Sequence, residues 1–400
     1  MSRLEELIQQ YCPDGVEYKS IESITKSICS GLNPRKNFTL NGKGATCYYL
    51  TVKEMTTGKI VFSDKTDKIT PDAVSVIQNR SRLEIDDILL SGIGTIGKVA
   101  IVDIPVDNWN CSESVLLLKP NKEIVCPKYL KYILEGNETQ AYFNSHATGS
   151  TLKGIRQKDL RTHSIPVPPL PVQEEIVRIL DTLTELQAEL QAELQARRKQ
   201  YEYYRDKLLT FSDLGKSGGW NVSVQWMKLG EITTILRGKR LTKSQLSNDK
   251  PYAVYHGGLE PLGYYESANR TANTTMIINV GASAGTIGYS KEDFWSSDGC
   301  YCVEHSELFD DRYIYYVLQT QEQQLKSKVR VAGIPTLDRP VVEDLLVPIL
   351  PLAEQQRIVD ILDRFHALTT DITAGLPAEI EARRKQYEYY RDRLLTFKQK

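Results

Sequence analysis

The chain has 400 residues and a formal net charge of −1, with 41% hydrophobic and 25% charged residues. This length allows roughly two to four domains, and the composition is that of a globular protein. The near-zero charge counts mildly against nucleic-acid binding through bulk charge. The sequence contains no run of about 18 apolar residues, so it predicts no membrane span. The seven scattered cysteines lack a CxxC pair, which favours a reducing cytoplasm over a disulfide framework or a zinc site.

Residues 1–165 are expected to form a first α/β domain. Apolar residues from Leu4 to Tyr11 fall at helical spacing, so a short helix should end near Pro13. Beyond it, strand-like stretches such as TCYYLTVKEM and ESVLLLK alternate with glycine-containing turns. A further helix is expected at about 128–134, after Pro127.

Residues 166–211 are expected to form a long spacer helix behind a proline-rich hinge, IPVPPLP. Leucines and aromatic residues step by three and four from Leu183 to Phe211, which favours a coiled coil. Tandem ELQ-AELQ-AELQ tetrads run from Glu185 to Gln195. One tetrad more or less would change the helix length by about 6 Å. A helical filler and a length ruler both remain open interpretations.

The second half repeats this order. A glycine- and serine-rich linker is expected at 212–223, a second domain at 224–347 and a second spacer helix at 348–400, bent or interrupted by Gly375 and Pro377. Four correspondences between the halves are predicted: Ile21 and Ile24 with Leu229 and Ile232, residues 94–97 with 285–288, KYLKYIL with RYIYYVL, and Asp159-Leu160 with Asp344-Leu345.

The most faithful repeat lies at the ends of the two helical regions. ARRKQYEYYRDKLLTF at 196–211 recurs as ARRKQYEYYRDRLLTF at 382–397, and only Lys207 and Arg393 differ. Such a copy predicts two structurally equivalent units in one chain. Each helical region carries one main apolar stripe, so antiparallel pairing of the two regions would bury both stripes.

One glycine-rich loop imitates a phosphate-binding motif. Residues 92–97 match GxGxxG and residues 92–98 match GxxxxGK. We reject both matches because Val99 replaces the required Ser or Thr and a strand, not a helix, should follow. A nucleotide-binding enzyme therefore remains only a minor alternative. The histidines show no metal-ligand spacing, and we expect no metal, no cofactor and no catalytic residues.

The whole pattern resembles the specificity subunits of type I restriction–modification systems. The resemblance rests on PLPVQEEIVRILD and LPLAEQQRIVDILD, the paired ARRKQYEYYRD(K/R)LLTF segments and the two diverged domains. It implies an α+β fold in which two α/β target-recognition domains of similar fold are separated by two long helical regions, packed as a pseudo-two-fold antiparallel coiled coil.

The resemblance also implies partners and a division of labour. Each domain would read one half of a split, asymmetric site on double-stranded DNA. The spacer helices would dock two modification (methyltransferase) subunits, directing adenine methylation or, with restriction subunits, ATP-dependent cleavage. In this family the tetrads are associated with the gap between half-sites, which favours the ruler. An interaction scaffold of coiled-coil type that never binds DNA is the alternative function.

Basic residues in loops are the candidate DNA contacts, since Arg and Lys reach guanine edges and phosphates. The alternative for each is a solvated charged face. The candidate DNA-binding residues are Arg35, Lys36, Lys98, Lys153, Arg156, Lys158, Arg237, Lys239, Arg240, Lys328 and Arg330. The candidate methyltransferase-docking residues are Arg197, Arg198, Tyr201, Tyr204, Arg383, Arg384, Tyr387 and Tyr390.

Overall fold

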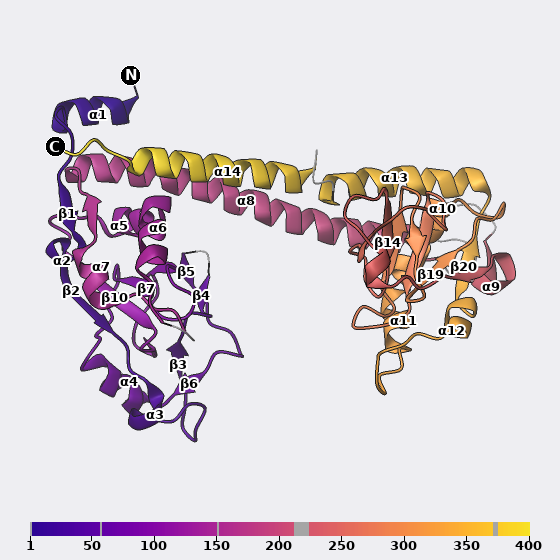
Figure 1. The fold of residues 1–400 in the computed structure, drawn as a ribbon, viewed down its shortest axis with the longest axis horizontal. Helices are drawn as coiled ribbons and strands as arrows, with labels where there is room; N and C mark the ends of the chain where they lie inside the picture. Colours follow the sequence, from indigo (N-terminus) through magenta and orange to yellow (C-terminus); the bar gives the residue numbers. More distant parts are fainter. Residues whose placement is uncertain (1, 57, 150–151, 212–223, 371–374) are drawn as a thin grey trace. The chain divides into compact units, whose positions relative to one another are not determined.

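The computed structural model describes residues 2–56, 58–149, 152–211, 224–370 and 375–400, so the predicted linker 212–223 lies outside the described residues. The chain divides into two compact units. Unit 1 comprises Met1–Glu189 and Ile380–Lys400, and unit 2 comprises Leu190–Glu379. Each unit therefore combines one α/β domain with two stretches of spacer helix (Figure 1). No helix among the described residues is long and apolar enough to cross a membrane.

The elements of the first half alternate short strands and helices. They are α1 (Arg3–Tyr11), β1 (Tyr18–Ser20), α2 (Ile21–Ile24), β2 (Thr25–Ser30), α3 (Pro34–Asn37), β3 (Cys47–Leu50), β4 (Met55–Thr56), β5 (Lys59–Ile60), β6 (Lys68–Ile69), α4 (Pro71–Gln78), β7 (Ile88–Ser91), β8 (Val99–Ile101), β9 (Trp109–Cys111), β10 (Val115–Pro120), α5 (Pro127–Glu135), α6 (Asn137–His146), α7 (Gln157–Thr162), β11 (Ser164–Pro166) and α8 (Leu170–Leu209).

The second half continues with a similar order. Its elements are β12 (Gln225–Lys228), α9 (Leu229–Ile232), β13 (Ile235–Arg237), η1 (Lys243–Gln245), β14 (Tyr252–Tyr255), β15 (Gly263–Tyr265), β16 (Thr274–Ile278), β17 (Ile287–Ser290), β18 (Trp295–Ser296), β19 (Cys300–Val303), α10 (Asp311–Thr320), α11 (Glu322–Ser327), α12 (Arg339–Glu343), β20 (Leu346–Ile349), α13 (Leu352–Thr370) and α14 (Leu376–Leu395).

The two domains share one sheet topology. The main sheet has the order β2-β10-β7-β8 in the first domain and β13-β19-β16-β17 in the second, with every pair antiparallel. A smaller sheet, β6-β3-β9 or β15-β14-β18, contains one parallel pair in each domain. A two-stranded sheet, β1-β11 or β12-β20, completes each set. The first domain adds the hairpin β4–β5 and the helix α4.

The main sheet is buried on both faces, which explains its nearly continuous apolar strands. In β7, Ile88 and Leu90 pack in one core cluster with Tyr129 of α5. Leu89 lies in a second cluster with Trp109 of β9. Because successive strand residues point to opposite faces, helix α5 covers one side and the smaller sheet the other. The strands β16 and β19 divide their residues between two clusters in the same way.

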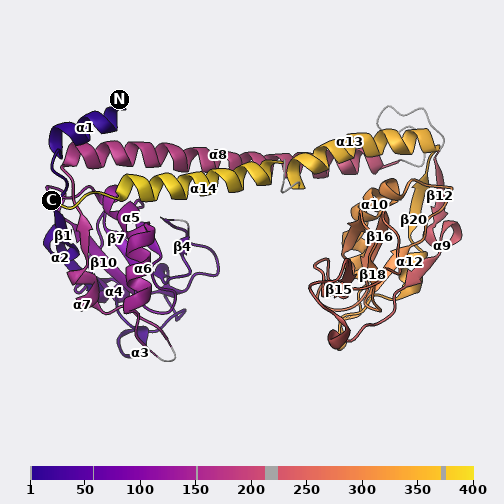
Figure 2. The same ribbon diagram turned by 45° about the horizontal axis from the view of Figure 1, so that its top comes forward.

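The spacer helices pack as predicted within each unit. In unit 1, Gln187 of α8 donates to the carbonyl of Arg383 at 3.2 Å, while Thr184 lies beside Tyr387. Residue numbers rise on one helix as they fall on the other, so α8 and α14 are antiparallel here, as both views show (Figure 2). In unit 2, Tyr204 of α8 stacks on Phe365 of α13.

The second helical region is interrupted, as expected. Helix α13 ends at Thr370 and α14 begins at Leu376, directly after Gly375 and with Pro377 in its first turn. Proline is tolerated there because the first amide groups of a helix have no intrahelical partner. Residues 371–374 lie outside the described part of the chain.

A buried glutamine joins each domain to its spacer helix. Gln173 of α8 accepts from the Cys126 amide at 2.8 Å and donates to the carbonyls of Ile124 and Pro168, at 3.0 and 2.6 Å. These three groups belong to the start of α5 and to the proline hinge. Since Gln173 is fully buried, it satisfies backbone groups that would otherwise be costly to bury.

Gln355 of α13 repeats this arrangement in unit 2. It accepts from the Asp310 amide at 2.8 Å and donates to the carbonyls of Leu308 and Leu350, at 3.0 and 2.7 Å. Gln355 is also fully buried. The repeat predicted from sequence therefore extends to individual hydrogen bonds.

Hydrogen bonds confirm two of the predicted correspondences. The Ile21 amide donates to the His163 carbonyl, and the Leu229 amide donates to the Leu345 carbonyl. Each carbonyl lies three residues before the proline, Pro166 or Pro348, that pairs in the two-stranded sheet. In α5 and α10, the hydroxyls of Tyr129 and Tyr313 donate to the carbonyls of Pro166 and Pro348.

Two other correspondences are wrong by a few residues. Gly97 donates to the carbonyl of the last β7 residue, and the matching donor after β16 is Gly285, not Gly288. Both glycines have φ near +90°, at +87° and +89°, which a β-carbon would strain. The loop after β16 is longer, so matching GTIG to GTIG shifted the alignment.

Likewise Leu160 has the place of Val342, not of Leu345. Both Leu160 and Val342 are fully buried, and each lies six residues before the proline carbonyl that accepts from the tyrosine of α5 or α10.

Candidate nucleic-acid interface

The glycine-rich loop at 92–97 is a turn between two strands. It connects β7 to β8, so a strand comes after it, as predicted, and not the helix that a phosphate-binding loop requires. Gly94 and Gly97 have φ of +83° and +87°. The loop therefore joins strands tightly, and no helix N-terminus faces a ligand here.

Two groups of candidate DNA-binding residues, Arg35 with Lys36 and Lys239 with Arg240, come after equivalent strands. Gly31 directly follows β2, and a β-carbon on it would lie 1.9 Å from the Cys111 carbonyl oxygen. Gly238 directly follows β13, where a β-carbon would lie 2.2 Å from the Ser296 carbonyl oxygen. Only glycine permits this approach to the end of the smaller sheet. The loops that leave these two points carry Arg35 and Lys36 in the first domain and Lys239 and Arg240 in the second.

Two further groups of candidate residues flank equivalent hairpins; they are Lys153, Arg156 and Lys158 in the first domain and Lys328 and Arg330 in the second. Residues 148 and 154 pair through two backbone hydrogen bonds of 2.9 and 2.8 Å, and residues 330 and 336 do so at 2.9 and 3.0 Å. Each hairpin also accepts an amide from the neighbouring turn of the main sheet: Gly94 donates to Lys153, and Gly281 to Pro335. The structure thus brings predicted DNA-contacting residues to the same two places in both domains.

Ion pairs divide the candidate cations into two groups. Arg156 pairs with Asp159 at 2.7 Å and Arg330 with Asp338 at 2.9 Å, so much of their charge is offset. The remaining exposed candidates have no acidic partner among the described residues. They are Lys98, Lys153, Lys158, Arg237, Lys239, Arg240 and Lys328. The side chains of Arg35 and Lys36 are not among those described.

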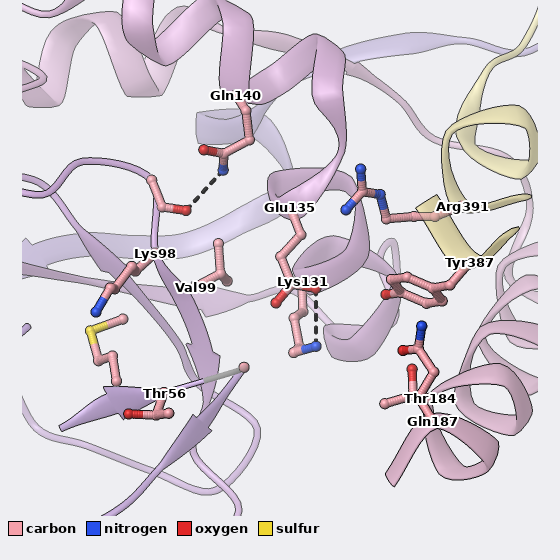
Figure 3. Close-up of a pocket in the computed structure, with 13 residues that line it drawn as sticks. Thr56, Lys98, Val99, Lys131, Glu135, Gln140, Thr184, Gln187, Tyr387 and Arg391 are labelled. Carbon is pink, nitrogen blue, oxygen red and sulfur yellow. Dashed lines mark hydrogen bonds and ion pairs between the residues drawn. The ribbon is translucent and has the colours of Figure 1, made fainter. Parts of the chain in front are cut away.

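Lys98 has a different setting from the other candidates. It lines a cavity of about 560 Å³ in unit 1, together with Lys131 and Glu135 of α5 and Tyr387 and Arg391 of α14 (Figure 3). Lys131 and Glu135 form an ion pair of 3.1 Å, and burial raises the pKa of the Glu135 carboxyl. Lys98 therefore faces a cavity that the spacer helices share.

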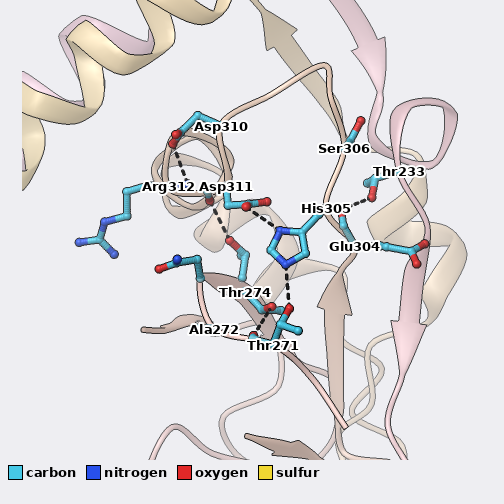
Figure 4. A network of polar contacts seen from close by, with 12 residues as sticks. Thr233, Thr271, Ala272, Thr274, Glu304, His305, Ser306, Asp310, Asp311 and Arg312 are labelled. Carbon is cyan, nitrogen blue, oxygen red and sulfur yellow. Dashed lines mark hydrogen bonds and ion pairs between the residues drawn. The ribbon is translucent and has the colours of Figure 1, made fainter. Parts of the chain in front are cut away.

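A network of polar contacts orders the start of α10 in unit 2. His305 accepts or donates at both ring nitrogens, 2.9 Å from the Thr271 hydroxyl and 2.6 Å from the Asp311 carboxylate (Figure 4). Burial is the main cause that raises the pKa of the Asp311 carboxyl. This chain of contacts ties the loop before β16 to the start of α10, which is a structural role for the histidine.

The candidate docking residues fall on more than one face of their helices. Tyr201 is buried and donates to Gln319 of α10 at 3.1 Å; burial raises the pKa of its hydroxyl. Tyr387 occupies the equivalent place against α5 in unit 1. Both tyrosines therefore contact their own domain. Tyr204 and Tyr390 are 37% and 39% exposed.

The sequence argument overlooked the most exposed aromatic pair. Tyr203 and Tyr389 are each 60% exposed, and each ring lies edge-on to the next tyrosine, at 5.3 and 5.4 Å. Helix periodicity already indicated this exposure, because a residue two positions after Tyr201 or Tyr387 lies on roughly the opposite face of the helix. The arginines near them form ion pairs on the helix: Arg197 with Glu193, and Arg384 with Glu381 and Glu388.

Two α/β domains with one topology, each fixed to long spacer helices and each carrying basic loops at matching positions, define a duplicated recognition and spacer architecture. The family described as "Type I restriction modification DNA specificity domain" matches residues 13–197 and 221–382. The chain belongs to this family. Specificity subunits of type I restriction–modification systems are non-catalytic and recognise DNA sequence, so the predicted family and the absence of an enzymatic role are confirmed.

Relatives from three organisms agree with this assignment. The chain is 34% identical over 285 residues to a putative type I restriction enzyme specificity subunit of Haemophilus influenzae, covering 65% of this chain and 70% of the relative. It is 33% identical over 255 residues to a type I restriction enzyme specificity subunit of Escherichia coli, covering 58% and 61%. A putative type I specificity subunit of Mycoplasma pneumoniae is 31% identical over 241 residues, covering 59% of this chain and 97% of the relative.

Solved structures share the fold. The specificity subunit of a type I system from M. genitalium superposes with a TM-score of 0.59 at 19% identity, over 96% of this chain and 97% of that chain. A chain from work on complex assembly and conformational transition of the type I system superposes with a TM-score of 0.60 at 16% identity, over 96% and 98%.

Proposed function

We propose that this chain binds a split, asymmetric site on double-stranded DNA, with one half-site for each domain, and that it holds two methyltransferase subunits. One contrast carries this proposal. The two domains keep the same backbone frame but change the side chains of their loops, whereas the helix repeat keeps 15 of 16 side chains, since only Lys207 and Arg393 differ.

Different loops on one frame fit two different DNA half-sites. The loops after Gly31 and Gly238, and the hairpins at 148–154 and 330–336, lie at equivalent points yet share little sequence. Base edges are read by side chains, while phosphates set register. Two unlike sets of side chains should therefore read two unlike half-sites.

Identical exposed residues fit two copies of one partner. Packing cannot explain why Tyr203 and Tyr389 are the same, because both are 60% exposed. The buried neighbours, in contrast, face different residues: Tyr201 meets Gln319, while Tyr387 lies against Glu135. Equivalent surfaces bind equivalent partners, one for each unit.

The tetrads are proposed to set the gap between the half-sites. Helix α8 runs unbroken from Leu170 to Leu209 through Glu185–Gln195. Removing one AELQ tetrad would shorten the helix by about 6 Å and rotate its C-terminal part by about 40°. The methylated site should then have a shorter gap and unchanged half-sites.

With its partners the chain would direct adenine methylation or, when restriction subunits are bound, ATP-dependent cleavage. We place this work in the cytoplasm, where the seven cysteines would stay free thiols. The chain itself needs no cofactor or metal for recognition.

Domain exchange tests the function. Residues 16–165 are replaced by the matching segment of another specificity subunit, the complex is produced with its methyltransferase, and methylated motifs are mapped across a genome. One half-site should change and the other should persist. A change in both half-sites would contradict modular reading, and no salt-sensitive DNA binding by the complex would support the pure scaffold instead.

The docking surface is tested by matched tyrosine variants. Tyr203→Ala and Tyr389→Ala should each weaken binding of one methyltransferase copy by a similar factor, and the double variant should weaken both, as counted by native mass spectrometry. Tyr11→Ala, which removes a tyrosine that is 44% exposed on α1, is the control. Equal binding by all variants would refute this surface.

A further inference from the structure

The hairpin at residues 330–336 presents two large apolar side chains to solvent. Val331 is 80% exposed and Ile334 is 72% exposed, the highest values among the exposed large hydrophobic residues described. Leaving such side chains in water forgoes about 25 cal/mol for each Å² that could be buried. Two of them on one short hairpin form an apolar tip that suits a partner surface.

The hairpin holds this tip in a fixed position. The backbones of Arg330 and Thr336 exchange two hydrogen bonds, and the Gly281 amide donates to Pro335 at 2.9 Å. Leu337, which is fully buried, anchors the base and donates its amide to the carbonyl of Asn279 at 2.8 Å. The apolar tip therefore projects from a braced turn, and its display does not depend on loop motion.

Charge around the tip favours a polyanion as the partner. Lys328, which has no acidic partner among the described residues, lies at the start of the hairpin, whereas Asp338 offsets much of the charge of Arg330 at its base. A phosphate backbone would pair with Lys328 while apolar side chains meet the bases.

Comparison of the two domains separates DNA from a protein partner. A protein common to both units would keep its contact residues, as the helix repeat does. The equivalent hairpins instead share backbone pairing but not sequence: Leu152 and Lys153 of the first domain correspond to Ile334 and Pro335 of the second. Leu152 is also apolar and 67% exposed.

We infer that Val331 and Ile334 are specificity-determining residues that contact bases of the half-site read by the second domain through apolar contact. Thymine methyl groups in the major groove and the faces of unstacked base steps are the DNA surfaces that aliphatic side chains recognise. This inference rests on the proposed function. It adds a kind of contact that basic residues cannot supply, because an apolar contact discriminates between bases without neutralising phosphates.

The salt dependence of binding separates the two kinds of contact. The full complex with its methyltransferase is measured on cognate and scrambled DNA over a salt series. In Val331→Ser/Ile334→Ser, affinity for cognate DNA should fall about 10-fold, the cost of roughly one lost base contact. The slope of log affinity against log salt should stay unchanged. Lys328→Ala should lower that slope by about one and affect both DNAs alike.

A matched control and the methylated motif complete the test. Leu308→Ser removes an aliphatic residue that is 46% exposed outside the hairpin and should bind as the parent does. Methylome mapping of the double variant should show relaxed sequence at one or two positions of one half-site, with the other half intact. Thermal unfolding and methyltransferase stoichiometry should match the parent.

The outcomes distinguish this inference from the proposed function. If the parent complex binds its site and the double variant binds within twofold with an unchanged motif, the hairpin inference is wrong and the function stands. If the double variant lowers the salt slope, the residues position phosphate contacts and the inference is also wrong. If the parent shows no site-specific binding, both fall.

Discussion

Unit 1 and unit 2 each join a domain to a spacer helix through an equivalent buried glutamine, Gln173 or Gln355. The ion pairs at the start of α5 and α10 differ between the units. In unit 1, Lys128 at the start of α5 pairs with Asp181 and is 53% exposed. In unit 2, Arg312 at the equivalent point pairs with Asp363 and is 10% exposed, with three tyrosine rings around its guanidinium. The backbone hydrogen bonds that fix the frame were retained, while the side chains between them diverged.

This difference teaches which interactions the duplication had to keep. A glutamine with three backbone partners cannot be exchanged without leaving buried polar groups unpaired. An ion pair near the surface can change its cation, its depth and its neighbours, because solvent screens the loss. Four experiments test this division, from the largest expected effect to the smallest.

The strongest test removes the glutamines. Gln173→Leu should destabilise unit 1 by about 3–6 kcal/mol, because the Cys126 amide and the Ile124 and Pro168 carbonyls lose their partner. Hydrogen exchange should show lost protection at the start of α5. Gln355→Leu should have an equal effect at the start of α10. Gln356→Leu, which alters an exposed residue next to Gln355, is the control. Unequal losses would mean that the two frames are not equivalent.

The second test compares the two cations. Arg312→Ala should cost about 2–4 kcal/mol of unfolding free energy in unit 2, because a largely buried guanidinium loses its ion pair with the half-exposed Asp363 and its three cation–π contacts. Lys128→Ala should cost less than about 1 kcal/mol in unit 1, where the lysine is half exposed. Denaturant titration followed by local exchange would measure both. Similar costs would show that depth does not matter here.

The third test uses acid. Burial lowers the pKa of His163 in unit 1 and of His366 in unit 2 to about 4, from an ordinary value near 6.5. Between about pH 4 and pH 6.5, both histidines are protonated in the unfolded chain but neutral in the folded chain. Stability is therefore complete above about pH 6.5 and falls as the pH drops toward 4, by up to about 3 kcal/mol for each histidine.

Phenylalanine variants assign this loss to the two units. His163→Phe should flatten the pH dependence of unit 1 alone, and His366→Phe that of unit 2 alone. Thermal unfolding at pH 7 and pH 4.5, read by exchange in each unit, measures the effect. Parent-like slopes in both variants would assign the acid sensitivity to other groups.

The smallest expected effect concerns an interaction that, among the described residues, is made in unit 1 alone. The Tyr18 hydroxyl donates to the Phe397 carbonyl at 3.0 Å, and the amides of Val16 and Lys400 complete a pairing of the two chain ends. Tyr18→Phe should cost about 1 kcal/mol. The residue with the same strand register in unit 2 is Trp226, which is 40% exposed. Trp226→Phe should change stability by less than about 0.5 kcal/mol. A larger effect at Trp226 would contradict the difference.

The sequence predicted most of the frame because its signals are local and strong. Apolar steps of three and four gave the spacer helices, and a near-perfect internal copy gave two units. The turn correspondence failed because hydrogen-bond register, not matching letters, aligns Gly97 with Gly285. Sequence spacing also could not show that α10 covers Tyr201, since the covering residue Gln319 is distant in the chain. The exposed hairpin residues Val331 and Ile334 were missed because apolar residues are ordinarily expected inside.

Gly31 and Gly238 lie at the two points where a fixed strand gives way to a variable loop. Since neither can accept a β-carbon, every loop that evolution or an engineer places there must leave from the same spot in the same direction. New specificities can then arise by exchanging the loops beyond these glycines, without redesigning the socket that carries them.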